Sequence, residues 1–214
     1  MSLVEVHEVG HTRAGTRVLD DINLTLDAAT TAVLAGRSGS GKSTLCHLVA
    51  GVMTPATGRV LVAGRPAHPA PDWATVSLLP QRLALDPTLT VAENILLPAA
   101  LRGSVPDRSL LDRLGLASIA TRPARDTSLG EQQRTALARS LILNPAIAVL
   151  DEPTAHQDDE HVQLVLDALT TATTTGTLVL IATHDQRVID IATVVARLTS
   201  GRLERVEKLG TTSP

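Results

Sequence analysis

Short apolar runs alternate with longer stretches of helical periodicity along most of the chain, a pattern typical of an α/β fold. Some runs are almost continuously apolar, as in strands buried on both faces of a parallel sheet. They are Thr31–Leu34, Val76–Leu79, Ile147–Leu150 and Leu178–Ile181. Other predicted strands are Val194–Leu198 and, near the N-terminus, Leu3–Val6, Ile22–Leu26 and Val60–Val62. The pattern therefore predicts a mostly parallel sheet with a small antiparallel β layer contributed by the N-terminal strands.

The strand pattern disappears between about residues 83 and 128, where helical periodicity takes over. Helix-breaking residues interrupt this stretch at Pro98, Gly103, Pro106, Gly115 and Pro123. We therefore expect a single domain over residues 1–209, with an α/β core formed by 1–81 and 136–209 and an inserted α-helical subdomain at 82–135. Residues 210–214 are expected to form a frayed tail.

Composition narrows the classes of function open to this chain. Its 214 residues are enough for one well-buried core and too few for two large domains. There is no Phe or Tyr and a single Trp, Trp73, which argues against nucleic-acid platforms that stack bases on aromatic rings and excludes a catalytic tyrosine. A net charge of −3 also argues against non-specific nucleic-acid binding.

The only cysteine, Cys46, permits neither an intrachain disulfide nor a cysteine metal cluster, and is expected to be a small core residue. Its isolation fits a reducing, cytoplasmic compartment. The first residues lack the basic and apolar regions of a secretory signal, and no apolar run approaches the ~20 residues needed to cross a bilayer. We expect any work at a membrane to depend on another protein.

A glycine-rich segment follows the apolar run Thr31–Leu34 and precedes a helical stretch. It reads Gly36-Arg37-Ser38-Gly39-Ser40-Gly41-Lys42-Ser43, followed by Thr44, and fits the phosphate-loop pattern G-x-x-x-x-G-K-[ST]. Glycines let backbone N–H groups point inward at phosphate oxygens, and the helix N-terminus favours an anion. Lys42 is expected to reach the β- and γ-phosphates, and the Ser43 hydroxyl to ligate Mg²⁺. A glycine-rich loop without a ligand is the less favoured interpretation.

Two adjacent carboxylates end the apolar run at 147–150. Asp151 is placed to hold Mg²⁺, usually through water, as in other phosphate-loop enzymes. Glu152 is expected to point elsewhere, because side chains alternate along a strand, and to accept a proton from an attacking water. A pair of solvated acids at a strand end is the alternative, and the upstream phosphate loop favours the catalytic interpretation.

The segment after the helical stretch resembles the signature of the ATP-binding-cassette (ABC) ATPase family, L-S-G-G-Q or L-S-G-G-E followed by Q-Q-R. It reads Thr127-Ser128-Leu129-Gly130-Glu131-Gln132-Gln133-Arg134. Other family marks occur in family order: Gln81 after one strand, Asp158 after the carboxylate pair, and His184 at the end of the next strand. The resemblance covers about residues 3–203 and implies a P-loop NTPase with a RecA-like core.

This resemblance implies a composite catalytic site. In the family, two cassettes enclose two ATP molecules head to tail, each between one phosphate loop and the partner's signature. The cofactors would be ATP and Mg²⁺. His184 would contact the γ-phosphate and hold Glu152 and the attacking water in line, and Gln81 would sense Mg²⁺ and that water. The residues that would face the partner's ATP are Ser128, Leu129, Gly130, Glu131 and Asp158.

The chain departs from the family pattern at several positions. Leu129 replaces the first signature glycine, and we expect it to resist a positive φ and to add bulk near the nucleotide. Thr127 and Gln157 each replace a usual apolar residue. Arg13 aligns, with His11 close by, where the family stacks an aromatic ring on adenine. Either the Arg13 guanidinium stacks on the base or it is an ordinary exposed arginine.

The segment Pro87–Pro98 and the end of the signature, Gly-Glu-Gln-Gln-Arg, resemble the corresponding segments of ATPases of lipoprotein release and macrolide efflux. This favours export or mechanotransmission through a separate transmembrane permease, whose cytoplasmic helix would dock around Gln81–Asn94. The other expected partner is a second ATPase subunit, identical or different, at the inner face of the cell membrane. Alternatives are an amino-acid-importer subunit or a slowly hydrolysing, nucleotide-gated regulator. A small-molecule kinase or a GTPase is disfavoured, because the guanine motif Asn-Lys-x-Asp is absent and the signature and His184 would have no role in such an enzyme.

Overall fold

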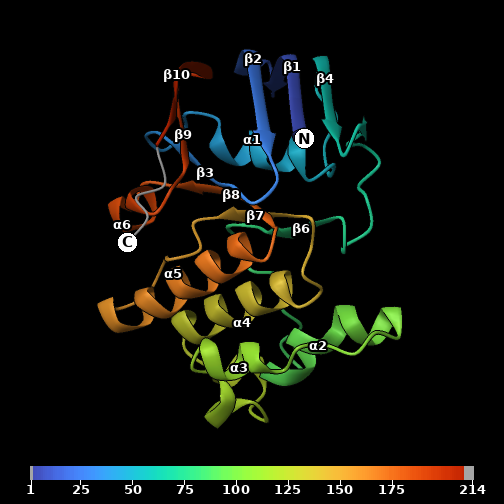
Figure 1. The fold of residues 1–214 in the computed structure, drawn as a ribbon, viewed down its shortest axis with the longest axis vertical. Coiled ribbons are helices and arrows are strands. Elements are labelled where there is room, and N and C mark those ends of the chain that lie inside the picture. The colour runs from blue at the N-terminus through green and yellow to red at the C-terminus, as the bar shows by residue number, and fades with distance from the viewer. Residues whose placement is uncertain (1, 210–214) are drawn as a thin grey trace.

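The larger of two sheets forms the centre of residues 2–209, the part of the chain that the computed structural model describes (Figure 1). The predicted tail at 210–214 lies outside the described residues. The strand order is β10-β9-β3-β8-β7-β6, with β10 antiparallel to β9 and the other neighbours parallel. The strands are β3 (Thr31–Ala35), β6 (Val76–Leu79), β7 (Ile147–Asp151), β8 (Leu178–Thr183), β9 (Val194–Thr199) and β10 (Arg202–Lys208).

A smaller antiparallel sheet has the order β2-β1-β4-β5. Its strands are β1 (Ser2–Arg13), β2 (Thr16–Asp27), β4 (Thr57–Val62) and β5 (Arg65–Pro66). The predicted mostly parallel sheet and small antiparallel layer are therefore confirmed. Strands β1 and β2 extend well beyond the predicted runs, because Ala14 and Gly15, with φ of 48° and 80°, form a two-residue turn suited to a long hairpin.

Helix α1 (Lys42–Val49) lies between the two sheets, and the other face of the larger sheet is covered by α4 (Leu129–Leu141) and α5 (Asp159–Thr174) (Figure 1). Buried residues divide accordingly. Val149 and Leu180 pack with α1, whereas their strand neighbours Leu150 and Ile181 pack with the helices on the opposite face. This explains why the central runs are continuously apolar. Cys46 is fully buried on α1, and burial raises the pKa of its thiol, which confirms it as a core residue.

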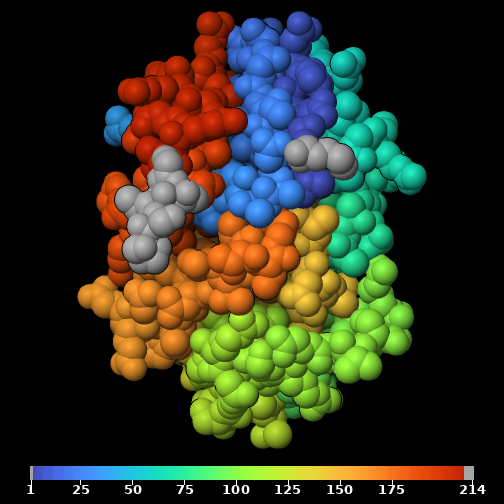
Figure 2. Space-filling view, in the orientation of Figure 1, coloured from blue at the N-terminus to red at the C-terminus, as the bar shows by residue number. Residues whose placement is uncertain are grey.

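The helical segment contains α2 (Val91–Arg102), α3 (Ser109–Arg113) and two 3₁₀ turns, Ala117–Ile119 and Ala124–Asp126. In Figure 2 its green residues occupy the end of the molecule opposite the blue strands. Helix α6 (Gln186–Asp190) follows β8. Among the described residues, no helix combines the length and the apolar character needed to cross a bilayer.

The expectation that Pro98 breaks a helix is wrong, because α2 runs through it. A proline inside a helix costs roughly 3 kcal/mol, but Pro98 lies on the buried stripe of α2 together with Val91, Ile95 and Ala99. Burial of this face and a capping box between Thr90 and Glu93 stabilise the helix. Helix α4 runs across the position where we expect the helical subdomain to give way to the α/β core.

Candidate functional site

The phosphate loop joins β3 to α1 and is packed so tightly that glycine is required at two positions. A Cβ added to Gly36 would lie 2.3 Å from the Leu198 carbonyl oxygen on β9. Gly41 has a φ of 107°, and an added Cβ would lie 2.9 Å from the Val18 carbonyl oxygen. The loop is thus held between β9 and the β1–β2 hairpin, with the first turn of α1 directly behind it.

Lys42 is the first residue of α1 and is buried within the loop. Its Nζ donates hydrogen bonds to the Gly36 carbonyl at 2.7 Å and the Arg37 carbonyl at 3.2 Å. The Ser40 hydroxyl is also buried and has no hydrogen-bond partner among the described residues. The loop therefore holds a buried cation and this buried hydroxyl at the start of a helix, which suits a polyphosphate.

A pocket of about 400 Å³ opens beside this loop and brings together predicted residues from separate parts of the chain. Arg13 comes from the tip of the β1–β2 hairpin, Gln81 from the segment after β6, and Asp151 and Glu152 from the end of β7. The loop residues in its wall are Ser38, Gly39, Gly41, Lys42, Ser43 and Thr44. Gly36, Arg37, Ser40 and His11 do not line this pocket, and Arg37 is exposed on the outer side of the loop.

Asp151 is the last residue of β7 and is only 2% exposed. Burial and the neighbouring Glu152 carboxylate raise its pKa, whereas a hydrogen bond from the Ser43 hydroxyl acts in the opposite direction. Its Oδ2 atom is buried without a hydrogen-bond partner among the described residues. A buried carboxylate oxygen with unused acceptor capacity, beside a serine hydroxyl in the phosphate-loop pocket, fits a Mg²⁺ ion held jointly with phosphate oxygens.

Glu152 lies outside the strand and has a φ of 51°. Its backbone N–H donates to the Ala182 carbonyl at 2.8 Å. The expectation that strand alternation separates the two carboxylates is therefore wrong, because a left-handed residue, not the pleat of β7, turns the Glu152 side chain. A non-glycine residue in this conformation is strained and is over-represented at functional sites.

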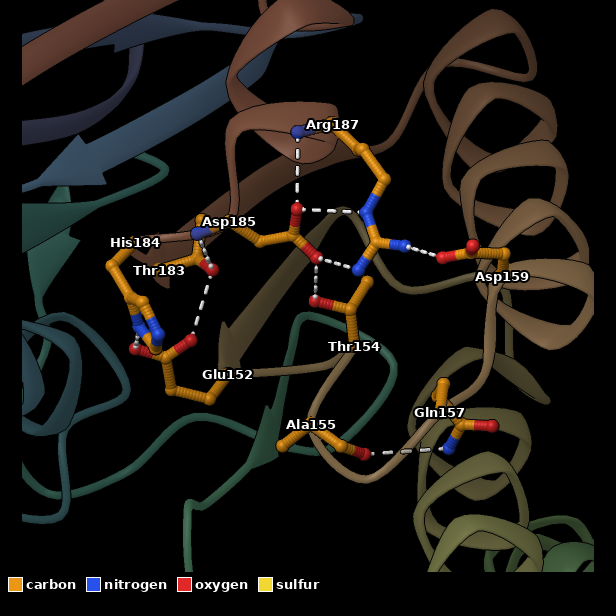
Figure 3. Close-up of polar contacts among 9 residues, drawn as sticks. All are labelled: Glu152, Thr154, Ala155, Gln157, Asp159, Thr183, His184, Asp185 and Arg187. Carbon is orange, nitrogen blue, oxygen red and sulfur yellow. Dashed lines mark hydrogen bonds and ion pairs between the residues drawn. The ribbon is translucent and has the colours of Figure 1, made fainter.

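Two side chains at the end of β8 hold the Glu152 carboxylate (Figure 3). The Thr183 hydroxyl donates to Oε2 at 2.9 Å, and His184 Nδ1 lies 2.9 Å from Oε1. The Glu152 side chain is 16% exposed and that of His184 is 81% exposed. The geometry thus fixes the orientation of Glu152 at the edge of the pocket, while most of the His184 ring faces outward.

Sequence reasoning gave no role to several residues that order this site. Gln133, on α4, donates through Nε2 to the Glu152 carbonyl at 3.0 Å and links the signature helix to the carboxylate. Asp185 accepts from the Thr154 hydroxyl and from Arg187, which also contacts Asp159 at 2.7 Å (Figure 3). For Thr154, Asp185 and Arg187 the only available signal was proximity in sequence to Glu152 or His184, and for Gln133 it was membership of the segment that resembles the signature.

Arg139, also on α4, holds the segment that follows Gln81. Its Nη1 donates to the Ala84 carbonyl at 2.8 Å, and its guanidinium lies 5.9 Å from the centroid of the Trp73 ring. Arg139 is buried, so this contact with an aromatic face compensates part of the lost hydration. The Gln81 segment is therefore anchored to the same helix that begins with the signature.

The signature forms the N-terminus of α4. Ser128 caps the helix: its hydroxyl accepts from the Glu131 N–H at 3.2 Å, and its own N–H donates to the Glu131 carboxylate at 2.7 Å. Leu129 is the first helical residue and does not have a positive φ. The expectation of backbone strain at this residue is therefore wrong. Leu129 therefore departs from the family pattern only by its bulk, since the residue is 58% exposed beside the helix cap.

A separate pocket of about 360 Å³ contains the signature residues together with Asp158, which caps α5. Among the described residues, the walls of this pocket and of the phosphate-loop pocket have no member in common. The cap of α4 and the phosphate loop of the same chain therefore line two distinct pockets.

Comparisons with known proteins agree with this geometry. The family model described as ABC transporter matches residues 19–155, more than half of the chain. The chain is 36% identical over 201 residues to the ABC transporter ATP-binding protein YtrE of Bacillus subtilis, covering 87% of each chain. It is 33% identical over 217 residues to the lipoprotein-releasing system ATP-binding protein LolD of Geobacter metallireducens, covering 95% of this chain and 96% of that protein.

Among solved structures, the chain is similar to a dimeric post-hydrolysis state of the ATP-binding cassette MJ0796 bound to ADP and Pi. The TM-score is 0.89 at 27% identity, and the match covers 97% of this chain and 99% of that chain. The match extends over both sheets and the helical segment, so the whole described fold is that of a cassette. This chain therefore belongs to the ABC transporter family and is one of its ATP-binding cassette ATPases.

Proposed function

We propose that this cassette dimerises around two ATP molecules and that their hydrolysis drives a separate membrane permease of export or mechanotransmission type. The observation that carries the proposal is the separation of the phosphate-loop pocket from the signature pocket. Because one chain does not bring its own signature to its own phosphate loop, a second cassette placed head to tail would complete each site.

The residues of the phosphate-loop pocket fit Mg²⁺ as a companion of ATP. Ser43, Gln81 and Asp151 would hold the ion, which when bound would neutralise charge on the β- and γ-phosphates. Lys42 and the N–H groups of the loop would bind the same phosphates. Gly36, Arg37, Ser38, Gly39, Ser40, Gly41 and Thr44 would complete the nucleotide site through the backbone and shape of the loop.

Glu152 is the proposed general base. Its carboxylate is oriented by Thr183 and His184 and borders both the phosphate-loop pocket and an adjoining pocket of about 640 Å³ that contains Gln81 and His184. A water between Glu152 and the γ-phosphate would transfer its proton to the carboxylate as it attacks. His184 and Gln81 would align that water.

From the partner subunit, the signature would contribute the α4 N-terminus. Ser128 and the Gly130 N–H would bind the γ-phosphate, with Leu129, Glu131 and Asp158 beside them. These assignments require the second cassette, so they predict that hydrolysis depends on subunit concentration.

The permease would hold the complex at the inner face of the cell membrane, with its cytoplasmic helix against the surface around Gln81–Asn94. LolD of Geobacter metallireducens, a relative over nearly the whole chain, is a lipoprotein-releasing system ATP-binding protein by name, which supports the export or mechanotransmission type. An importer of amino acids remains the alternative transporter. A slowly hydrolysing regulator of a membrane partner is favoured by one observation only, the exposed bulk of Leu129 in the signature.

The variant Leu129→Gly separates the proposed function from the regulator. Because Leu129 is an ordinary first helical residue without strain, we expect the ATPase rate of the variant to stay within about threefold of wild type. A steady-state phosphate-release assay on both proteins, with the exposed helix residue Leu101→Gly as control, measures this. A slow wild type accelerated at least tenfold by the substitution would support the regulator instead.

Arg13→Ala tests whether the hairpin tip stacks on adenine. We expect ATP affinity to fall about two- to fivefold, the range of an exposed cation–π contact. Titration calorimetry with ATP and with inorganic tripolyphosphate measures it, and only the ATP value should change. Arg17→Ala, on the same hairpin, is the matched control. Equal ATP affinity of wild type and Arg13→Ala would show that Arg13 is an ordinary exposed arginine.

A further inference from the structure

Gln157 belongs to the segment Thr154–Asp158, which we call the D-loop segment (Figure 3), and its side chain contacts the signature helix α4. Its amide is half-buried and therefore needs hydrogen-bond partners, which an apolar residue at this position would not. The loop here is not part of a helix or strand, so its position depends on such side-chain contacts.

The Gln157 amide contacts both elements. Its Nε2 donates to the Gly130 carbonyl at 2.9 Å and approaches the Ala155 carbonyl at 3.4 Å. Its Oε1 accepts from Arg134 Nη1 at 2.5 Å. Donor and acceptor are thus used together, and a single side chain joins two residues one turn apart on α4 to the D-loop segment.

Arg134 is a rigid anchor for this contact. It is only 5% exposed, and its Nε donates to the Leu114 carbonyl at 2.9 Å in the helical segment. The guanidinium is therefore fixed on one side by Leu114 and on the other by Gln157. A planar guanidinium with two fixed partners permits little movement of the Gln157 amide.

The backbones of α4 and of the D-loop segment are also in close contact. A Cβ added to Gly130 would lie 2.8 Å from the His156 carbonyl oxygen, so the start of α4 rests directly on the D-loop segment. Asp158, the residue after Gln157, lines the same pocket as Ser128 and Gly130. A displacement of the D-loop segment would therefore change the shape of the signature pocket.

We propose that Gln157 is a positioning residue that locks the signature to the D-loop segment, so that Ser128, Gly130 and Asp158 present one rigid surface to the nucleotide of the other subunit. This inference rests on the proposed function, because it requires the composite site. Its distinctive consequence is directional: Gln157 serves the site to which its own chain contributes the signature, and not the site to which that chain contributes the phosphate loop.

A mixed dimer with a single working site tests that direction. Lys42→Ala removes the phosphate-loop cation of one chain, and Ser128→Arg blocks the signature of the other. In the mixed dimer, the remaining site uses the signature of the Lys42→Ala chain and the phosphate loop of the Ser128→Arg chain. Gln157→Leu is then added to one chain or the other, and kcat and KM for ATP are measured.

We expect Gln157→Leu on the signature-donating chain to lower kcat roughly fivefold, the effect of losing about one net hydrogen bond. KM for ATP should change less than twofold, and the same substitution on the phosphate-loop-donating chain should change kcat less than twofold. Gln157→Glu, which keeps an acceptor for Arg134 but offers no donor to the Gly130 carbonyl, should repeat this pattern. It guards against loss of folding, since it leaves the buried Arg134 paired.

The exposed Gln163→Leu on α5 is the matched control and should leave kcat unchanged on either chain. Equal losses of kcat from both placements of the Gln157 variants, or no loss from either, would overturn the inference while the composite site stands. An inactive parent mixture of Lys42→Ala and Ser128→Arg would overturn the composite site and this inference together.

Discussion

Replacing Glu152 with Gln is expected to lower the rate of ATP hydrolysis by about 10²- to 10⁴-fold, the contribution typical of a general base. The amide cannot take a proton from water, yet it has nearly the volume of the carboxylate and leaves the phosphate loop intact. ATP binding should therefore persist. Because the bound nucleotide is no longer consumed, the ATP-bound dimer should accumulate.

Phosphate release measures the first effect, and size-exclusion chromatography with light scattering, in Mg²⁺ and ATP, measures the second. Glu160→Gln removes an exposed carboxylate from the first turn of α5 and is the matched control. It should hydrolyse ATP like wild type and give no trapped dimer. Turnover near the wild-type rate in Glu152→Gln would contradict the role of Glu152 as the base.

Lys42→Ala should abolish measurable hydrolysis and weaken ATP binding about 10- to 100-fold, the range of one charge-assisted contact. The Lys42 ammonium is buried in the loop and held by the Gly36 and Arg37 carbonyls, so the substitution removes a cation that the loop itself holds in place. Ser128→Arg should also be inactive, because its bulk and charge disrupt the cap of α4. Mixing the two inactive variants should restore part of the activity, since each supplies what the other lacks.

Calorimetry with ATP and phosphate release from single and mixed variants measure both effects. Lys208→Ala, at the chain's only other lysine and exposed at the end of β10, is the control and should behave as wild type. A mixture as inactive as its components would contradict the head-to-tail arrangement. Activity retained by Lys42→Ala alone would contradict the proposed binding of phosphates by Lys42.

Hydrophobic patterning was sufficient to predict the central strands, because each of them is buried on both faces and its composition follows directly from that environment. It did not predict β10, an edge strand in which Leu203 and Val206 are the only apolar residues. It also missed the full length of β1 and β2, whose long hairpin depends on the Ala14–Gly15 turn. The predicted break at Pro98 was wrong, because burial of this face of α2 outweighs the tendency of proline to end a helix.

The candidate site shows a similar division. The phosphate loop follows from a local motif whose glycines, lysine and serine all act within a few residues. By contrast, the positive φ of Glu152 depends on how β7 ends and the helical φ of Leu129 on how α4 begins, which spacing alone does not reveal. The contacts of Gln133 and Gln157 join segments 19 and 27 residues apart, so only the folded chain brings them together.

The contact between Trp73 and Arg139 has a practical consequence. The chain has no tyrosine and no other tryptophan, so its near-ultraviolet emission comes from one indole. That indole lies against the guanidinium that also holds the Ala84 carbonyl, three residues after Gln81. The unmodified protein thus carries an intrinsic fluorophore beside the segment expected to communicate with a permease, and its emission can follow that segment through a catalytic cycle without a dye.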